Sequence, residues 1–574
     1  MENKRKQELV SYLNDMSSEY QKAVDTAPEL LNGVSEGWFL SLDKTSSKVA
    51  KGHVFVPVVG GFSAGKSTAL NGLLERKILP EAVSAETAIP AELHFSTDEH
   101  LLALGVNGEW EQHPLESLSE LTNRAAEFQV VRLFVNCQAL KQIEPLVLVD
   151  MPGFDSGLDQ HNQAILRYLT SGVLYLYLVN SKDGTVNRQD FRRLEEIVDL
   201  GRSVRVFLSR CDLIAPSDLQ DIRELVVDQL ALILDGSSVE CIDQDTIQPI
   251  ISALDNADLS KLFDGMYLNE VKSLYFDANA NLCTAISALS KNSKEIEKQL
   301  DDAKISVARV EAEKDQMLNE VKNAAVDEKA NLIVSRVEKT LQYSLSELAV
   351  TASAGQEALS RSVGDLVRST LTVEIQKFVR SYSSEVVFKF SDTFKVNTDF
   401  LNTMKQDWLR DLAATLEIEA MNALSGISEA HTPRSDNLGN VLASMLSGVA
   451  MRIPNPVLKV VLAVLPQFIS SLFGNFQEKR KEDQFSQVIA DQLIPGVTAQ
   501  IRPQVLDSLN SIQLEMIKAV AEQFSQKIEC EKKILDDLVN SSDSVRESLR
   551  EGLNTLKSIR TSINQLTDQI LNKG

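Results

Sequence analysis

Cysteine, histidine and basic charge are scarce in this chain of 574 residues, and each scarcity excludes a class of protein. The five cysteines form no Cys-x-x-Cys pair, which favours a reducing compartment and excludes a structural zinc site. The six histidines form no metal-ligand cluster. The formal net charge of −23 argues against a nucleic-acid partner, which needs a basic surface, and against docking on anionic lipid by charge alone.

The amino terminus lacks the apolar segment of a signal peptide, since it opens Met-Glu-Asn-Lys-Arg-Lys and stays polar. We therefore expect a cytoplasmic protein, and a peripheral position at the membrane stays open. Residues 1–25 carry apolar side chains every three or four positions, which predicts an amphipathic helix that packs on an apolar partner elsewhere. These side chains are Leu9, Leu13, Met16, Tyr20 and Val24.

Proline is absent between Pro249 and Pro433 and again after Pro503, which permits very long helices because proline breaks helix interiors. Apolar residues in two of these stretches repeat at spacings of mostly three and four. Such spacing is typical of a coiled coil with a partner chain or of a bundle within one chain, and both remain open. The two series are Ile296, Leu300, Ala303, Val307, Val310, Met317, Val321 and Ala324, and Val545, Leu549, Leu553, Leu556, Ile559, Ile563, Leu566 and Ile570.

The part of the chain before these helices alternates short apolar runs with polar, helix-compatible stretches. Continuous apolar runs predict buried strands, and their alternation with helices predicts an α/β domain with a mostly parallel sheet and helices on both faces. The predicted strands are His53–Val59, Gln129–Val135, Leu146–Val149, Val173–Val179, Val204–Leu208 and Pro249–Ile251.

A glycine-rich segment, Gly-Gly-Phe-Ser-Ala-Gly-Lys-Ser-Thr, follows the first predicted strand and fits a phosphate-binding loop (P-loop) between a strand and a helix. Its backbone N–H groups can surround a phosphate chain. Lys66 supplies positive charge to the β- and γ-phosphates, and the Ser67 hydroxyl is a Mg²⁺ ligand. We expect nucleotide contacts from Gly60, Gly61, Phe62, Ser63, Ala64, Gly65, Lys66, Ser67 and Thr68.

Two further segments predict how the site responds to the γ-phosphate. One strand ends in Asp-Met-Pro-Gly, so we expect Asp150 to hold Mg²⁺ through water and Gly153 N–H to bond the γ-phosphate. Thr87, after the first helix of the domain, is expected to supply a Mg²⁺ ligand and a carbonyl that orients water. Contacts of this kind order a loop around the triphosphate and release it on hydrolysis.

Guanine selection is predicted from Ser-Arg-Cys-Asp at the end of another strand. The carboxylate of Asp212 can accept hydrogen bonds from guanine N1 and N2, a donor pair that adenine lacks. Arg210 is expected over the base plane, where lysine is usual, although its planar guanidinium is not equivalent. Ser252, after the last predicted strand, is expected in a further base-contacting loop. Together these residues predict GTP and Mg²⁺ as cofactors.

These motifs resemble the dynamin superfamily, specifically its bacterial dynamin-like proteins. The resemblance rests on Gly60 to Thr68, Thr87, Asp150 to Gly153 and the Ser-Arg-Cys-Asp segment, and elsewhere only on the order of helical regions. It implies a low-affinity GTPase whose nucleotide domains pair with each other or with a related dynamin-like partner, and which remodels membranes or releases vesicles. It also implies a neck, where the first helix joins the last ones, and a trunk ending in a membrane-directed tip.

Two positions depart from related GTPases. Eukaryotic dynamins carry glutamine where Phe62 stands, and small Ras-like GTPases carry glutamine where Phe154 stands. Hydrolysis must therefore use backbone groups, a partner in trans or another residue, and we expect slow basal turnover. Ser63 matches the serine of the dynamin loop and is expected to stabilise transition-state charge. Ser63, Lys66 and Thr87 are thus the catalytic candidates.

Residues 441–473 are unusually apolar and are divided by Pro-Asn-Pro. Their second half carries a lysine and a proline and falls short of the ~20 apolar residues that span a bilayer. Burial in the bundle, insertion into one leaflet and spanning are all open, and the resemblance favours insertion. The expected membrane contacts are Val457, Val461, Leu462, Leu465 and Phe468.

The predicted organisation is a helical segment over 1–45, a dynamin-type GTPase domain over 46–270, and a helical-bundle neck and trunk over 271–574 with a tip at 438–475. The leading function is a GTPase that drives conformational change at membranes. The alternatives are a nucleotide-gated helical scaffold that binds protein partners with little hydrolysis, and a helical bundle whose nucleotide site has decayed.

Overall fold

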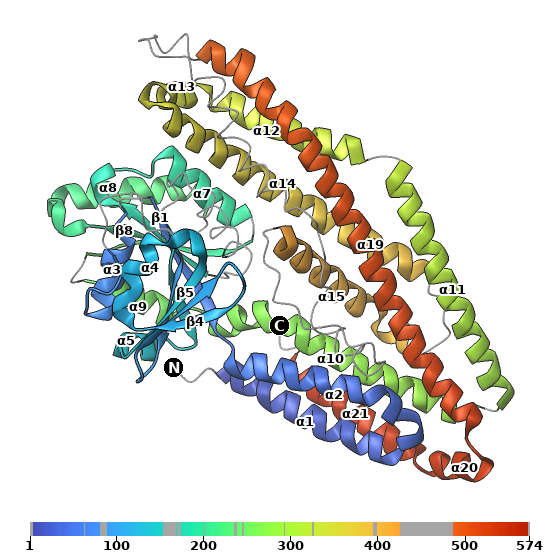
Figure 1. The fold of residues 1–574 in the computed structure, drawn as a ribbon. Coiled ribbons are helices and arrows are strands. Elements are labelled where there is room, and N and C mark those ends of the chain that lie inside the picture. Colours follow the sequence, from blue (N-terminus) through green and yellow to red (C-terminus); the bar gives the residue numbers. More distant parts are fainter. Residues whose placement is uncertain are drawn as a thin grey trace.

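The fold combines one β-sheet with long helices (Figure 1). A computed structural model describes residues 4–61, 64–80, 89–152, 168, 174–199, 201–234, 238–243, 246–291, 293–323, 326–393, 399–424 and 486–571, and every structural statement refers to these residues.

The sheet has nine strands in the order β4-β3-β5-β2-β6-β1-β7-β8-β9. Strand β1 is central, between β6 and β7, and it runs parallel to both. The strands are β1 Val54–Gly60, β2 Ala91–Phe95, β3 His100–Gly105, β4 Trp110–His113, β5 Phe128–Val135, β6 Leu146–Asp150, β7 Leu174–Asn180, β8 Ser203–Ser209 and β9 Val239–Cys241.

The predicted mostly parallel sheet is confirmed, because β2–β5, β7–β8 and β8–β9 are also parallel pairs. Only β2–β6, β3–β4 and β3–β5 are antiparallel. Helices pack against the sheet, and together with it they form the sheet domain, from β1 to α9. Its helices are α3 Lys66–Leu74, α4 Leu118–Asn123, α5 Gln138–Ile143, α7 Arg188–Asp199, α8 Pro216–Leu230 and α9 Gln248–Asp255, with short 3₁₀ turns η1 Leu115–Ser117, η2 Ala125–Glu127, η3 Ser181–Asp183 and η4 Cys211–Leu213.

One predicted strand is wrong. Pro249–Ile251 forms the first turn of helix α9, and the last strand of the sheet is β9. Proline near a helix start fixes a helical φ and loses no hydrogen bond. The buried side chains Ile250, Ile251 and Leu254 have the spacing of a helix face, and the three-residue apolar run was too short to distinguish the two structures.

The remaining helices form two arms that meet near α20 (Figure 1). The first arm contains α1, α2, α10 and α21, and the second contains α11, α12, α14 and α19. The sheet domain lies in the angle between them. The bounds are α1 Lys4–Thr26, α2 Pro28–Lys51, α10 Leu259–Leu289, α11 Ser293–Asn323, α12 Val326–Tyr343, α13 Leu345–Ala354, α14 Gln356–Thr393, α15 Asp399–Leu424, the π-helix η5 Ile489–Leu493, α19 Ile494–Asn540, α20 Asp543–Glu551 and α21 Leu553–Ile570.

The first helix joins the last ones, as the resemblance implied. All five apolar side chains predicted for its inner face are buried, and α1 packs on α2, α10 and α21. Tyr12 and Thr567 of α21 are linked through their hydroxyls at 2.9 Å. The expected domain boundaries at 45 and 270 fall inside α2 and α10, so the three-part division stays a prediction.

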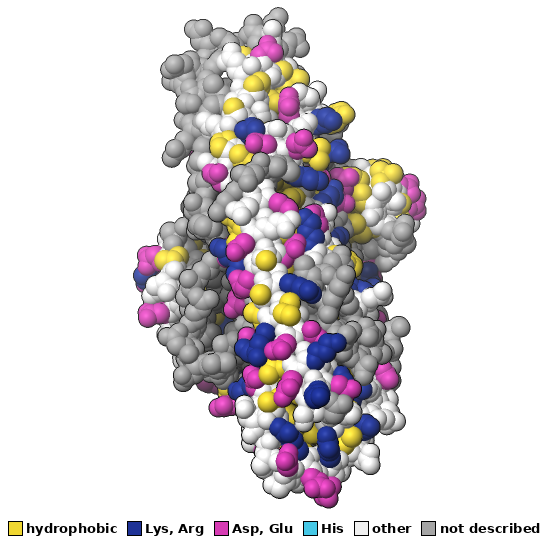
Figure 2. Space-filling view, turned by 90° about the vertical axis from the view of Figure 1, so that its right-hand side faces the viewer, with side chains coloured by type: hydrophobic (Ala, Val, Ile, Leu, Met, Phe, Trp, Pro, Cys, Tyr) yellow, Lys and Arg dark blue, Asp and Glu magenta, His cyan; other side chains and the backbone are white. Residues whose placement is uncertain are grey.

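The two apolar series are bundle cores within this chain. The series over α11 buries Ile296, Leu300, Ala303, Val310 and Met317, and this helix packs along α19. The series over α20 and α21 packs on α10 and α1. Figure 2 shows the face that includes α11, where acidic and basic side chains are mixed and neither sign forms a separate patch.

The apolar segment 441–473, with the five expected membrane contacts, lies outside the described residues. Within the described ranges, no helix combines the length and the apolar character that crossing a bilayer requires.

Candidate nucleotide site

The P-loop begins where β1 ends, and two glycines make its path possible. Gly60 has φ of 150°, and a Cβ there would lie 2.4 Å from the carbonyl oxygen of Leu178 on β7. Gly65 has φ of 75° and forms the N-cap of α3. Both positions therefore need glycine, for space or for left-handed backbone.

Lys66 lies at the start of α3 and is buried. Its Nζ donates hydrogen bonds to the carbonyl oxygens of Gly60 and Gly61, each at 3.0 Å. The ammonium group is thus held inside the loop, where the positive end of α3 also points. This arrangement favours an anion within the loop.

Ser67 and Asp150 come together as the sequence predicted. Strand β6 places Asp150 in register with Val58 of β1, and Met151 N–H donates to Val58 O at 3.3 Å. The Ser67 hydroxyl then donates to Asp150 Oδ2 at 2.8 Å. The two expected Mg²⁺ residues are therefore neighbours, although they lie 83 positions apart in the sequence.

The environment of Asp150 fits a cation. Burial raises the pKa of Asp150 to about 6, against the opposing effects of the Lys66 charge and the Ser67 hydrogen bond. Its Oδ1 atom is buried and has no hydrogen-bond partner among the described residues. A buried carboxylate oxygen without a partner is costly, and a hard cation with oxygen ligands would satisfy it. The residues present therefore fit Mg²⁺.

The expected guanine-binding segment lies beside the P-loop. Arg210 adopts left-handed backbone with φ of 57°, and a Cβ on Gly65 would lie 3.4 Å from Arg210 Nε. The side chain of Arg210 thus passes close to the P-loop. Asp212 is exposed in η4, where its carboxylate is free to meet a base.

Two hydrogen bonds that the sequence did not predict hold the Ser-Arg-Cys-Asp segment in place. The Ser181 hydroxyl donates to Arg210 O at 3.0 Å, and Cys211 N–H donates to Ile242 O at 3.3 Å. Ser181 directly follows β7, so its position at the end of a predicted strand was the available signal. Ile242 follows β9, which the sequence did not reveal.

Several predicted site residues stay untested. Phe62, Ser63, Thr87 and Gly153 lie outside the described residues. Ser252 lies inside α9 rather than in a loop, and the loop after the last strand starts at Ile242 instead. Its proposed contact with the base stays a prediction.

In the described part of the chain, no group of three or more His, Cys, Asp or Glu side chains is arranged so that it could hold a metal ion.

Comparison with solved structures gives matches with low sequence identity and low TM-scores. A structure of an oligomerised bacterial dynamin pair, described as a mechanism for long-range sensing and tethering of membranes, shares 15% identity over 92% of this chain and 91% of its own, with a TM-score of 0.32. Era from Aquifex aeolicus with GDP and AlF4⁻ shares 15% identity over 40% of this chain and 67% of its own, with a TM-score of 0.21. At these TM-scores neither match supports a conclusion.

Sequence comparison is more specific. An uncharacterised protein from Caldicellulosiruptor sp. (strain Rt8B.4), encoded in the xynA 3′ region, is 21% identical over 181 residues, which is 30% of this chain and 44% of that relative. Residues 56–208 match the sequence model of the dynamin family. They run from within β1 to within β8 and contain the P-loop and Asp150. Over these residues, the chain is similar to the dynamin family.

Proposed function

We propose that this protein binds GTP with Mg²⁺ and hydrolyses it, and that the helical arms convert the change of nucleotide into movement at a membrane. The observation that carries this proposal is the pair Ser67 and Asp150 behind the P-loop, with Asp150 Oδ1 buried and without a partner among the described residues. Such a pair is the expected site of the metal that accompanies a nucleoside triphosphate.

The proposed roles combine the positions of Lys66, Ser67 and Asp150 with the sequence motifs. Lys66 and the loop N–H groups bind the β- and γ-phosphates, and Ser67 and Asp150 hold Mg²⁺, which would neutralise charge that develops on the phosphates. Thr87 and Gly153 couple the γ-phosphate to the surrounding segments, and Ser63 supports the transition state. Asp212 selects guanine and Arg210 covers the base.

Hydrolysis is proposed to depend on self-association. Phe62 and Phe154 offer no side-chain amide to orient water, so an isolated molecule is expected to turn over slowly. Pairing of nucleotide domains, with a second copy or with a related dynamin-like protein, would supply the missing group. A protein that binds GTP without measurable turnover at any concentration would instead be a nucleotide-gated scaffold.

Titration calorimetry tests the binding step. Wild-type protein should release or absorb heat with GTP and Mg²⁺, and should bind ATP more weakly. Lys66→Ala should lose most of this affinity, whereas Lys77→Ala should keep it, because Lys77 is exposed just beyond α3. Equal affinity of the Lys66→Ala variant and the wild type would contradict the proposal.

A further inference from the structure

The sheet domain contacts the helical arms in two separate places. Near the first arm, the chain itself crosses from α2 into β1 and from α9 into α10, and Tyr267 of α10 donates to His53 O at 3.2 Å. The second place involves no nearby chain crossing: α7 of the sheet domain lies against α14 of the second arm (Figure 1). This second contact is held entirely by noncovalent interactions.

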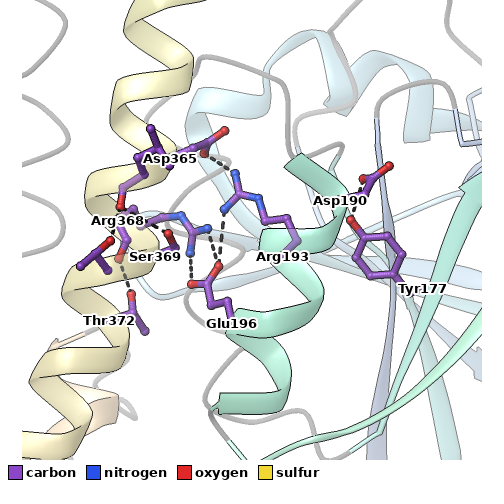
Figure 3. A network of polar contacts seen from close by, with 10 residues as sticks. Tyr177, Asp190, Arg193, Glu196, Asp365, Arg368, Ser369 and Thr372 are labelled. Carbon is purple, nitrogen blue, oxygen red and sulfur yellow. Dashed lines mark hydrogen bonds and ion pairs between the residues drawn. The ribbon is translucent and has the colours of Figure 1, made fainter. Parts of the chain in front are cut away.

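The centre of the second contact is a group of buried charges (Figure 3). Arg368 of α14 donates to both carboxylate oxygens of Glu196 on α7, at 2.6 and 2.8 Å. Arg193 of α7 lies 3.5 Å from the same carboxylate and pairs with Asp365 of α14. Arg368 is 0% exposed, Arg193 3% and Glu196 4%, so three of these charges are fully removed from water.

A second, half-buried pair borders this group. Arg192 of α7 donates to Glu347 of α13 at 2.7 Å and to Ser344 Oγ at 2.9 Å. The contact between the sheet domain and the second arm thus has equal numbers of positive and negative side chains. Its position is fixed by charge pairing as well as by packing.

Buried ion pairs behave differently from apolar contacts when two surfaces separate. Their mutual attraction roughly offsets the cost of removing both charges from water, and separation returns both charges to water. Arg368 Nε is also buried without a hydrogen-bond partner among the described residues, which adds to the cost of the closed arrangement. Such a contact fixes one relative position of the sheet domain and the second arm. It resists separation of the two less than an apolar contact of equal area would.

The same helix is tied to the nucleotide site. Tyr177 of β7 donates to Asp190 of α7 at 2.7 Å (Figure 3). The side-chain amide of Asn187 donates to Asp190 Oδ2 and its Oδ1 accepts from Asp190 N–H, each at 2.8 Å. Strand β7 pairs with β1 next to the P-loop, where Gly60 lies in register with Leu178. Strand β7 therefore connects the P-loop with α7.

We propose that Arg193, Glu196, Asp365 and Arg368 form a releasable clamp, which holds the sheet domain against the second arm and opens as the domain turns about the crossings at the first arm. The closed structure is one of two positions of the domain, and the clamp sets the balance between them. The proposal rests on the proposed function only for the signal, which is nucleotide in the P-loop.

Small-angle X-ray scattering of nucleotide-free full-length protein tests the clamp. Arg368→Glu places a negative charge against Glu196 and should increase the radius of gyration relative to wild type. Lys377→Glu makes the same change at an exposed position of α14 and should leave it unchanged. A folded Arg368→Glu variant, with wild-type circular dichroism and wild-type scattering, would overturn the clamp.

The reciprocal variant covers the case in which Arg368→Glu does not fold. Glu196→Arg with Arg368→Glu places two positive side chains on α7 opposite two negative ones on α14, so pairing across the contact is kept. This double variant should fold and scatter like wild type, and failure to do so would count against the clamp. Calorimetry with GTP and Mg²⁺ on wild type is independent: absence of heat would refute the nucleotide proposal and leave the scattering result intact.

Discussion

At the scale of single residues, Ser67, which bonds Asp150, tests the proposed Mg²⁺ site. Ser67→Ala removes an oxygen ligand, and we expect GTP affinity in Mg²⁺ to fall roughly 10- to 100-fold, which corresponds to about 1.5–3 kcal/mol. Calorimetry in Mg²⁺ and in EDTA checks this, with the exposed Ser217→Ala as control. A variant that keeps the wild-type response to Mg²⁺ would exclude this role for Ser67.

Asp212 carries the prediction for base selection. Asp212→Asn replaces a carboxylate, which only accepts hydrogen bonds, by an amide that also donates. The variant should lose the paired hydrogen bonds from guanine N1 and N2, and its amide N–H can donate to the O2 atom of xanthine instead. We expect at least a tenfold loss of GTP affinity and a gain for XTP. Competition binding with GTP, XTP and ATP measures this. Unchanged preference for GTP would show that another residue reads the base.

The pKa of Glu92 predicts how the stability of the sheet domain changes at acidic pH. Burial would raise its pKa, but hydrogen bonds from His94 and Tyr168 and the charge of Arg132 outweigh burial and lower the pKa to about 2. Because the folded pKa lies below the unfolded value of 4.5, the ionised group stabilises the fold above pH 4.5 and loses this contribution as pH falls toward 2.

The expected contribution of Glu92 is about 3 kcal/mol at neutral pH. Glu92→Gln should therefore destabilise the protein at pH 7, and its difference from wild type should shrink between pH 5 and pH 3. Thermal unfolding across this range, with the exposed Glu116→Gln beside it, measures the difference. A gap between Glu92→Gln and wild type that stays constant with pH would rule out this explanation.

The site could be predicted from the sequence only where a motif has fixed spacing. The P-loop and Asp150 follow from such motifs, and the structure places Ser67 against Asp150. The contacts of Ser181 and Ile242 with the Ser-Arg-Cys-Asp segment depend on how distant strands pair, so the sequence offered only the position of Ser181 at a strand end as a signal.

At the scale of elements, the packing of α1 against α21 closes the first arm. Tyr12 is 1% exposed and bonds Thr567, so Tyr12→Ala leaves a cavity and should cost about 3–5 kcal/mol. Ser11→Ala, on the exposed side of the same helix, should cost little. Hydrogen exchange of the α21 amides should accelerate in the first variant alone. Equal protection in both would mean that α21 does not depend on α1.

Elements were predicted well where one physical signal dominates. Strands β6 and β7 are fully buried, β1 is buried at every position but Phe55, and all three have continuous apolar runs. Helix α1 has a clear apolar stripe. Strand β3 alternates in burial although Leu101 to Leu104 are all apolar, and β4 is exposed at the sheet edge and has no continuous apolar run. Helix α9 was misassigned because its apolar run is short.

At the scale of the whole molecule, contact with a membrane is expected to depend on the apolar segment rather than on charge, given the net charge of −23. Leu462→Asp with Leu465→Asp should abolish flotation with liposomes, since apolar burial contributes roughly 25 cal/mol per Å². Leu232→Asp alters an exposed leucine elsewhere and should float like wild type. Wild-type flotation should persist in high salt, and flotation of the double variant would assign binding to another surface.

The relative placement of the arms and the sheet domain was beyond sequence reasoning. The spacing of apolar residues along α11 and α21 predicts which face is buried but not against which helix. The contact of α7 with α14 uses charged residues, which sequence patterns treat as exposed, and its pairs lie 172 positions apart.

GTP turnover, measured across a range of protein concentrations with and without liposomes, tests the central claim most directly. The account predicts that dilute protein hydrolyses GTP slowly and that the rate per molecule rises with protein concentration. Liposomes should raise the rate further, and Lys66→Ala should abolish turnover. Rapid turnover that is independent of concentration would contradict the dependence on self-association, and no turnover at any concentration would contradict the claim that this chain is a GTPase.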